Sequence, residues 1–126
     1  MALTKEVVVG ENSEEYFKRS RCSFRFFHLS REQADRVVKA NHEAKIRPSR
    51  QVSGAFVVSF QLVEDGDYSW LGELISLWSL SQEDFGFFLS LLTARDSDIV
   101  SLPVFVGELF RRMGGCFDFS FTFIED

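Results

Sequence analysis

The stretch Cys116-Phe-Asp-Phe-Ser-Phe-Thr-Phe-Ile124 decides the fold of this chain. Phenylalanine occupies every second position from 117 to 123, and polar residues stand between. Successive side chains of a strand point to opposite faces, so this spacing predicts a strand with one apolar face. We expect helices to cover that face, which makes this the core strand. The polar face, Asp118, Ser120 and Thr122, is the part that is left to touch a partner.

Residues 20–28 and 51–63 are the next predicted strands. The first alternates Cys, Phe and Phe with Arg, Ser and Arg, which predicts a buried face and a basic outer face. The second is rich in Val and Phe, which are strand formers. Between them, Ser30-x-x-Gln33 is a capping-box pattern that predicts the start of a helix. Pro48 disfavours helix just before it, so this helix should end near Ala44.

The second half of the chain is harder to assign. Asp65-Gly66 is a hairpin signal, so residues 68–80 are expected to return as an antiparallel strand, at least in part. The apolar residues of that segment also fit helical spacing, and periodicity alone does not decide. Ser81-x-x-Asp84 is a second capping pattern and predicts a helix over 85–93. A third helix is predicted from Pro103 to Met113, followed by Gly114.

This order of elements predicts one α+β domain over residues 1–126. The expected architecture is a mainly antiparallel sheet of about four strands with two to three helices packed on one face. It is compatible with a ferredoxin-like core that occupies residues 20–124, with 1–18 as an extension. A chain of 126 residues is long enough to bury a core without disulfides or metals.

The composition indicates a soluble cytoplasmic protein. The N-terminus lacks a signal-peptide pattern, and no apolar run approaches the roughly 20 residues that span a bilayer. The net charge of −5 is unevenly distributed. Residues 1–63 carry 11 basic and 7 acidic side chains, whereas residues 64–126 carry 3 and 12. The two halves are therefore expected to present different surfaces to partners.

Residues suited to catalysis are few. The two histidines, His28 and His42, have neither a partner histidine nor acids at metal-ligand spacing. Cys22 and Cys116 lack redox or metal spacing, and two reduced buried thiols are favoured over a disulfide. The sequence therefore predicts no enzyme activity, no metal and no cofactor. An enzyme or small-ligand domain with an unseen pocket remains an alternative.

Two surfaces are candidates for binding. The first combines acids with aromatic residues, which are common interface anchors, and suits a basic protein. Its members are Glu64, Asp65, Asp67, Tyr68, Trp70, Glu73 and Trp78. The second is basic and suits an anion or a nucleic acid. Its members are Arg21, Arg25, Arg36, Lys39, Arg47 and Arg50.

In size and composition the chain resembles small acidic α+β immunity or inhibitor proteins of bacterial toxin and phage defence systems. This resemblance implies a non-enzymatic protein that neutralises a basic toxin or nuclease, as a monomer or homodimer, without membrane contact. The alternative is a nucleic-acid-associated or regulatory module that uses the basic surface of residues 18–50. Salt-dependent binding of DNA or RNA would separate the two functions.

Overall fold

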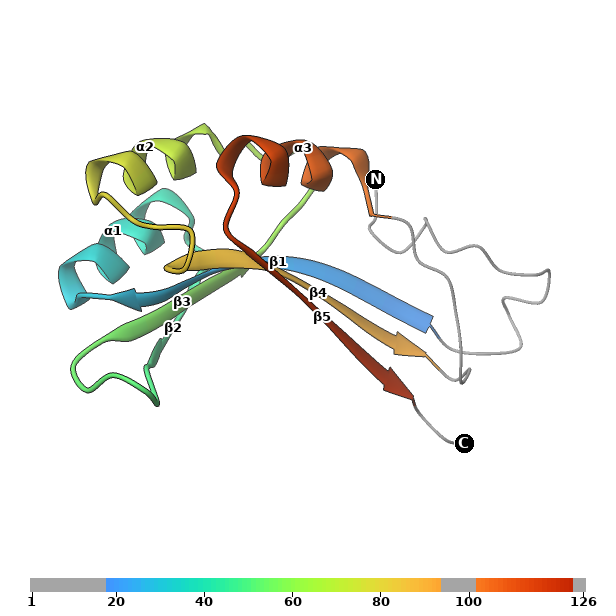
Figure 1. Cartoon of the computed structure of the whole chain (residues 1–126), viewed down its shortest axis with the longest axis horizontal. Helices are drawn as coiled ribbons and strands as arrows, with labels where there is room; N and C mark the ends of the chain where they lie inside the picture. The colour runs from blue at the N-terminus through green and yellow to red at the C-terminus, as the bar shows by residue number, and fades with distance from the viewer. Residues whose placement is uncertain (1–17, 94–101, 124–126) are drawn as a thin grey trace.

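Eight elements make up the described part of the protein, residues 18–93 and 102–123 of a computed structural model (Figure 1). Five are strands and three are helices. They run β1 Lys18–Leu29, α1 Arg31–Ala40, β2 Lys45–Pro48, β3 Phe56–Gln61, α2 Ser69–Leu77, β4 Phe85–Thr93, α3 Val104–Met113 and β5 Cys116–Phe123.

The strands form one mixed sheet in the order β2-β3-β1-β4-β5. All neighbours are antiparallel except β4 and β5, which run parallel. The first six elements have βαββαβ connectivity with β4, β1, β3 and β2 side by side, which is the ferredoxin-like arrangement. The predicted α+β class is confirmed, and α3 and β5 extend that core by one parallel strand.

Strand β1 lies at the centre of the sheet and supplies much of the core. Cys22, Phe24 and Phe26 are fully buried on one face, as the alternation predicts. The Phe24 ring packs edge-on against Phe26 at 5.1 Å between centroids and against Phe87 at 5.2 Å. Rings in this geometry attract each other beyond their burial. The core is therefore organised around β1.

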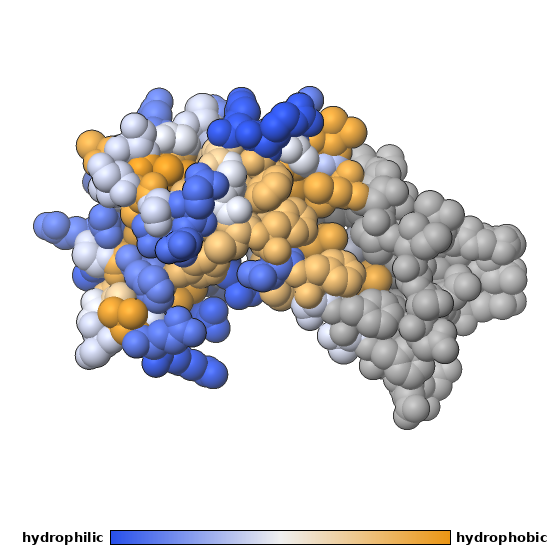
Figure 2. All heavy atoms as spheres, in the orientation of Figure 1, coloured by the Kyte–Doolittle hydropathy of each residue, from blue (hydrophilic) through white to orange (hydrophobic). Residues whose placement is uncertain are grey.

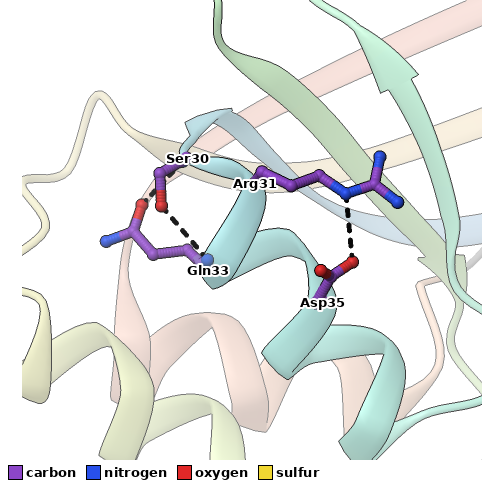
Figure 3. A network of polar contacts seen from close by, with 4 residues as sticks. All are labelled: Ser30, Arg31, Gln33 and Asp35. Carbon is purple, nitrogen blue, oxygen red and sulfur yellow. Dashed lines mark hydrogen bonds and ion pairs between the residues drawn. The ribbon is translucent and has the colours of Figure 1, made fainter.

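All three helices lie on the same face of the sheet, and in this view the opposite face carries no described helix (Figure 1). Helix α1 begins where the capping box predicts (Figure 3). Gln33 N donates to Ser30 Oγ at 3.1 Å, and Ser30 N donates to Gln33 Oε1 at 2.9 Å. Arg31 Nε pairs with Asp35 Oδ1 at 3.3 Å on its exposed side. Ala34 and Val37 are buried against the sheet.

The sequence interpretation of residues 41–63 is wrong at its boundaries. Helix α1 ends at Ala40, not near Ala44, because Asn41 is extended and its Oδ1 accepts from Glu43 N at 3.0 Å. The released chain forms β2, which the sequence analysis did not predict. The single predicted strand 51–63 is a loop followed by β3. Gly54, at φ 83°, supports the loop because a side chain there would be strained.

Residues 69–77 form helix α2, so the predicted return strand is wrong and the helical alternative is correct. Leu71 and Leu74, three residues apart, are buried together. Asp67 starts the helix by accepting from Ser69 N at 3.0 Å and from Ser69 Oγ at 2.9 Å. The Asp65-Gly66 turn therefore leads into a helix rather than a hairpin.

Residues 85–93 form strand β4, so the predicted helix there is wrong. The capping bonds do form: Ser81 N donates to Asp84 Oδ2 at 2.8 Å, and Asp84 N donates to Ser81 O at 3.0 Å. They close a turn that precedes a strand. Nearly every residue of 85–92 is apolar, so period 2 fits as well as period 3.6, and pairing with β1 decides for the strand.

The prediction that the phenylalanine stretch is the core strand is wrong, because β5 lies at the edge of the sheet. Phe117 is partly covered by Phe110, at 5.3 Å between centroids, whereas Phe119 is 57% exposed. Helix α3 forms after Pro103 and ends at Gly114, as predicted. Gln82 joins this corner to β4, since its amide donates to Met113 O and accepts from Gly115 N.

Candidate anion-binding site on the open sheet face

The sheet face opposite the helices, called the open face from here on, carries cations among small residues. Strand register places Lys45, Ser59, Arg25, Gly86 and Cys116 in one row across the five strands. Paired residues share a face, and Arg25 lies opposite the buried Phe24 and Phe26. In Figure 2 hydrophilic residues lie at the lower left, where β2, β3 and their loop are, as well as over the helices at the top. This face is therefore polar and basic.

Two more rows continue the open face beyond Arg25. One joins Gln61, Ser23, Phe88 and Asp118. The other joins Arg21, Ser90 and Ser120. Short side chains therefore surround the arginines and Phe88, so a ligand can approach these large side chains from above.

A hollow of about 850 Å³ lies on this face, and we call it the arginine hollow. Its volume is in the range of small-molecule sites. Three arginines and two carboxylates line it, so its formal charge is positive. Its lining residues are Arg25, Phe27, His28, Arg47, Pro48, Ser49, Arg50, Gln51, Val57, Glu83, Cys116 and Asp118.

Arg25 has the most constrained environment in the arginine hollow. Its Cζ lies 4.3 Å from the centroid of the Phe88 ring, which is a cation–π contact. Its Nε is buried and has no hydrogen-bond partner among the described residues. Burial lowers the pKa of Arg25, and the nearby Arg47 charge lowers it further, whereas Asp118 raises it. An anion in the arginine hollow would relieve the repulsion between Arg25 and Arg47, and it would reach the buried Nε if the Arg25 side chain moves on binding.

A β-bulge in β1 shapes one wall. Phe26 pairs with Val58, but Leu29 pairs with Phe56, so β1 contains one residue more than β3 between these pairs. Leu29 remains buried under the helices, while Phe27 and His28 both line the arginine hollow. The bulge therefore gives this wall two consecutive side chains.

The opposite wall is the loop between β2 and β3, which carries Arg50. Ser49 orders this loop: its Oγ accepts from Gln51 N at 3.2 Å and from Val52 N at 3.1 Å. Ser49 N donates to Ala55 O at 2.8 Å and closes the loop. Arg47 precedes the loop on β2. Arg47, on β2, and Arg50, in this hydrogen-bonded loop, therefore line the same hollow as Arg25.

The structure gathers four of the six predicted basic residues on the open face. Arg25, Arg47 and Arg50 line the arginine hollow, and Arg21 lines a second hollow of about 220 Å³ with Ser90, Leu91, Leu92 and Thr122. Arg36 and Lys39 lie on helix α1, in the layer on the other side of the sheet, and are exposed there. These two residues do not belong to the same site.

The predicted acid–aromatic set separates by burial. Its acids, Glu64, Asp65, Asp67 and Glu73, are exposed. Its aromatic residues pack inward: Tyr68 is 8% exposed and stacks on Phe60 at 6.1 Å. Trp70 contacts Phe60 at 5.5 Å, and Trp78 contacts Phe26 at 6.2 Å.

Residues 64–67, called the acidic loop, are fixed by these aromatic neighbours. Val63 N donates to the Tyr68 hydroxyl at 2.8 Å, and Trp70 Nε1 donates to Asp67 O at 2.9 Å. Hydrogen bonds from Ser69 lower the pKa of Asp67. Burial raises the pKa of Tyr68, and the Asp65 and Glu43 charges raise it further. The acidic loop is thus a rigid, negatively charged corner.

Sequence reasoning misses Phe27, Phe88 and Glu83 as site residues. Phe27 follows Arg25 at period 2, so the alternation of β1 already places it on the open face. The bulge, which has no sequence signature, adds His28 to this wall and returns Leu29 to the core. Phe88 is missed because residues 85–93 look helical. Glu83 reaches the hollow only through the turn before β4.

The two cysteines are free thiols on opposite faces of the sheet. Cys22 faces the core, where burial raises its pKa to about 12, while Cys116 lines the arginine hollow. Strand β4 separates them, which agrees with two reduced cysteines, but the prediction that both are buried is wrong for Cys116, which is only partly buried.

The described ranges, 18–93 and 102–123, contain no group of three or more His, Cys, Asp or Glu side chains placed to hold a metal ion. Within the same ranges no helix has the length and apolar character needed to cross a membrane. Comparisons with models of protein families, with curated proteins and with solved structures found no match for this chain.

Proposed function

We propose that this protein is a non-enzymatic binding protein whose ligand site is the arginine hollow and whose ligand is anionic. The observation that carries this proposal is the state of Arg25. A partly buried guanidinium with an unpartnered Nε, beside a second arginine, is unfavourable in the free protein. A phosphate or carboxylate group in the hollow would offset the repulsion between the arginines, and charge-assisted hydrogen bonds to a repositioned Arg25 would be strong.

The arrangement supports binding rather than catalysis. The arginine hollow contains three arginines and two carboxylates from different elements, together with His28 and the Cys116 thiol. Among the described residues no hydrogen bond joins His28 to a hydroxyl or thiol, which is the pairing that activates a nucleophile. Arginine is suited to oriented recognition of planar anions, because its donors form a fixed fork.

The test is a titration with sodium pyrophosphate, followed by NMR of backbone amides and arginine side chains. We expect the Arg25 Nε–H signal and the amides of residues 47–51 to shift, and the amides of α1 to stay unchanged. Arg25→Met should weaken the response about tenfold, because one charge-assisted hydrogen bond is lost. Arg36→Met is the matched control, since Arg36 is an exposed arginine on α1. Equal shifts in α1 and the hollow would disprove the site.

A second candidate function is inhibition of a basic protein, such as a toxin or nuclease, through the acidic loop. The rigidity of this loop favours it, because a pre-ordered loop loses little entropy on binding. Charge reversal at Asp65, Asp67 and Glu73 tests it in a pull-down from the native host. Retention of every captured basic protein by the reversed variant would rule out this surface.

A further inference from the structure

We propose that the anionic ligand is a single strand of nucleic acid that crosses the open face from the arginine hollow to Arg21. This inference rests on the proposed function, because it requires the open face to bind anions. It adds the class of ligand and the direction in which the ligand lies. Three features of the open face support it. They concern the phosphates of the ligand, its bases and its orientation.

The first feature is the spacing of the cations, which concerns the phosphates. Arg21 and Arg25 lie on the same side of β1, four residues apart, which is about 13 Å between their Cα atoms. Each lines its own hollow, one of about 850 Å³ and one of about 220 Å³. Two cationic hollows in line along one strand suit a ligand with repeated negative charges. A single phosphate group would occupy only one of them.

The second feature is the flat surface between these arginines, which concerns the bases. Phe88 is partly exposed on the open face, and the Arg25 guanidinium lies 4.3 Å over its ring. Ser23 is its neighbour in the row, and Gly86 and Ser90 flank it along β4, so apart from the Arg25 guanidinium the neighbouring side chains are short. Unstacked bases pack on aromatic rings and on arginine planes. An acidic peptide would pair with the arginines but would make no use of the flat surface.

Gly86 is required for this flatness. A Cβ on Gly86 would lie 2.7 Å from the backbone oxygen of Cys116, so any larger residue would push β5 away. The same glycine leaves the position beside Arg25 without a side chain. The close parallel pairing of β5 with β4 beside Arg25 therefore depends on this glycine.

The third feature is the pair of carboxylates, which concerns orientation. Asp118 lies on β5 and Glu83 precedes β4, so both stand on the far side of Arg25 from Arg47 and Arg50. They would repel phosphates near Arg25, so within the arginine hollow the backbone of the ligand should lie toward β2, before it reaches Arg21. The bases then point toward β5, where a carboxylate can accept from the amino group of cytosine. The open face should therefore prefer cytosine over thymine.

The experiment measures fluorescence anisotropy with labelled oligonucleotides dC12 and dT12, and with dC2 as a short probe, at low salt. We expect dC12 to bind at least tenfold more tightly than dC2 and several-fold more tightly than dT12. The logarithm of the association constant should fall with the logarithm of salt concentration with a slope of about −2 to −3, because three or four phosphates are neutralised.

Four variants locate the ligand. Arg21→Met and Arg25→Met should each weaken dC12 binding about tenfold, and Arg36→Met on α1 is the matched control that should leave it unchanged. Asp118→Asn should reduce the preference of dC12 over dT12, because an amide both donates and accepts. Thermal melting of each variant checks that it is folded. Arg21 is exposed, so its replacement does not endanger the core.

The outcomes separate the two proposals. If pyrophosphate shifts the Arg25 signal but dC12 binds no better than dC2, the nucleic-acid inference fails and the anion site stands. Tighter binding of a labelled polyglutamate peptide than of dC12 also overturns the inference and favours an acidic protein ligand. If neither pyrophosphate nor dC12 binds, both proposals fail. Length-dependent binding that Arg21→Met weakens and Arg36→Met does not is the supporting result.

Discussion

The two faces of strand β1 differ in almost every property although they share one backbone. Toward the helices, Cys22 and Phe24 are fully buried. Toward the open face, Arg21 is exposed and Arg25 lies in a hollow with a buried, unpartnered nitrogen. Adjacent residues therefore belong to opposite environments. The face that folds the protein and the face proposed to bind its ligand are separated by the thickness of one sheet.

This separation has a practical meaning for mutation. A ferredoxin-like sheet with helices on one side can hold its core with that side alone. Substitutions on the helix-covered face should therefore change stability, whereas substitutions on the open face should change binding. Four variants, ordered by expected effect, test whether the division holds.

The largest effect is expected from Phe24→Ala on the covered face. Removing a buried phenylalanine costs about 3–5 kcal/mol in the free energy of unfolding, from lost burial and the cavity left behind. Phe24 packs against four other rings, including Phe60 and Phe85 at 5.7 Å each, so the site cannot close easily. Urea unfolding followed by circular dichroism measures the change.

Phe119→Ala is the matched control, because the same substitution is made where the ring is 57% exposed. Its cost should stay within about 1 kcal/mol, as for most surface positions. Equal losses in the free energy of unfolding for Phe24→Ala and Phe119→Ala would mean that β5 contributes as much to the core as β1. That result would contradict the difference between the two strands.

The second prediction concerns pH and the Cys22 thiol. Burial raises its pKa to about 12 in the folded protein, from an ordinary value of 9.0. As pH rises above 9, the unfolded chain loses the thiol proton first, so folding stability falls between pH 9 and 12. Between pH 8 and pH 10 this loss is about 1.4 kcal/mol. Cys22→Ala should lack it.

Urea unfolding of the wild-type protein and of Cys22→Ala at pH 8 and pH 10 measures this loss. The cavity that Cys22→Ala creates lowers the stability of the variant equally at both pH values, so it does not affect the pH-dependent change. A thiol reagent provides a second readout. Cys116 should react in the folded protein, and Cys22 only after unfolding, because Cys22 is fully buried and Cys116 is not. Equal pH dependence in the two proteins would contradict the assigned environment of Cys22.

The third prediction addresses the helix layer that makes the two faces different. Ser30→Ala removes the oxygen that accepts from Gln33 N at the start of α1. We expect a loss of about 1 kcal/mol, which is typical of an N-cap. Gln33→Ala and the double variant complete a cycle, and thermal denaturation measures it. If the effects of the two single variants simply add, the reciprocal box is not one unit.

The smallest effect is expected from Arg25→Met on the open face. Methionine keeps much of the length of the side chain but removes a charge that is partly buried and a nitrogen without a partner. Removing this charge and nitrogen should stabilise the fold, whereas loss of the cation–π contact to Phe88 should destabilise it. The free energy of unfolding should therefore rise by about 0–1 kcal/mol while pyrophosphate binding weakens. A loss of more than 2 kcal/mol would show that the open face carries the fold as well.

How much of this fold could be predicted depends on whether local signals agree with strand pairing. Ser30-x-x-Gln33 and Ser81-x-x-Asp84 are the same kind of pattern, and both make their local hydrogen bonds. The first precedes residues with a clear helical period, and α1 follows. The second precedes an apolar run that fits either period, and pairing with β1 makes it β4. No local signal reports that pairing.

The site follows the same rule. The alternation of β1 correctly places Arg21 and Arg25 on the outer face. Arg47 and Arg50, chosen from the basic composition of residues 18–50, lie in the same hollow as Arg25. The register that brings β2 beside β3, and Phe88 beside Ser23, joins segments distant in the chain. The acid–aromatic surface could not be resolved from sequence, because its acids are exposed while Tyr68 is buried.

The central position of β1 also has a consequence for synthesis. Strand β1 leaves the ribosome before either of its neighbours. Phe60, the partner of Phe24 on β3, comes 36 residues later, and Phe87, its partner on β4, comes 63 residues later. Until then Phe24 and Phe26 have no sheet to enter, and long-range pairing is slow to form. The nascent chain therefore exposes these two phenylalanines until β3 and β4 have been synthesised, and exposed apolar side chains favour aggregation before folding is complete.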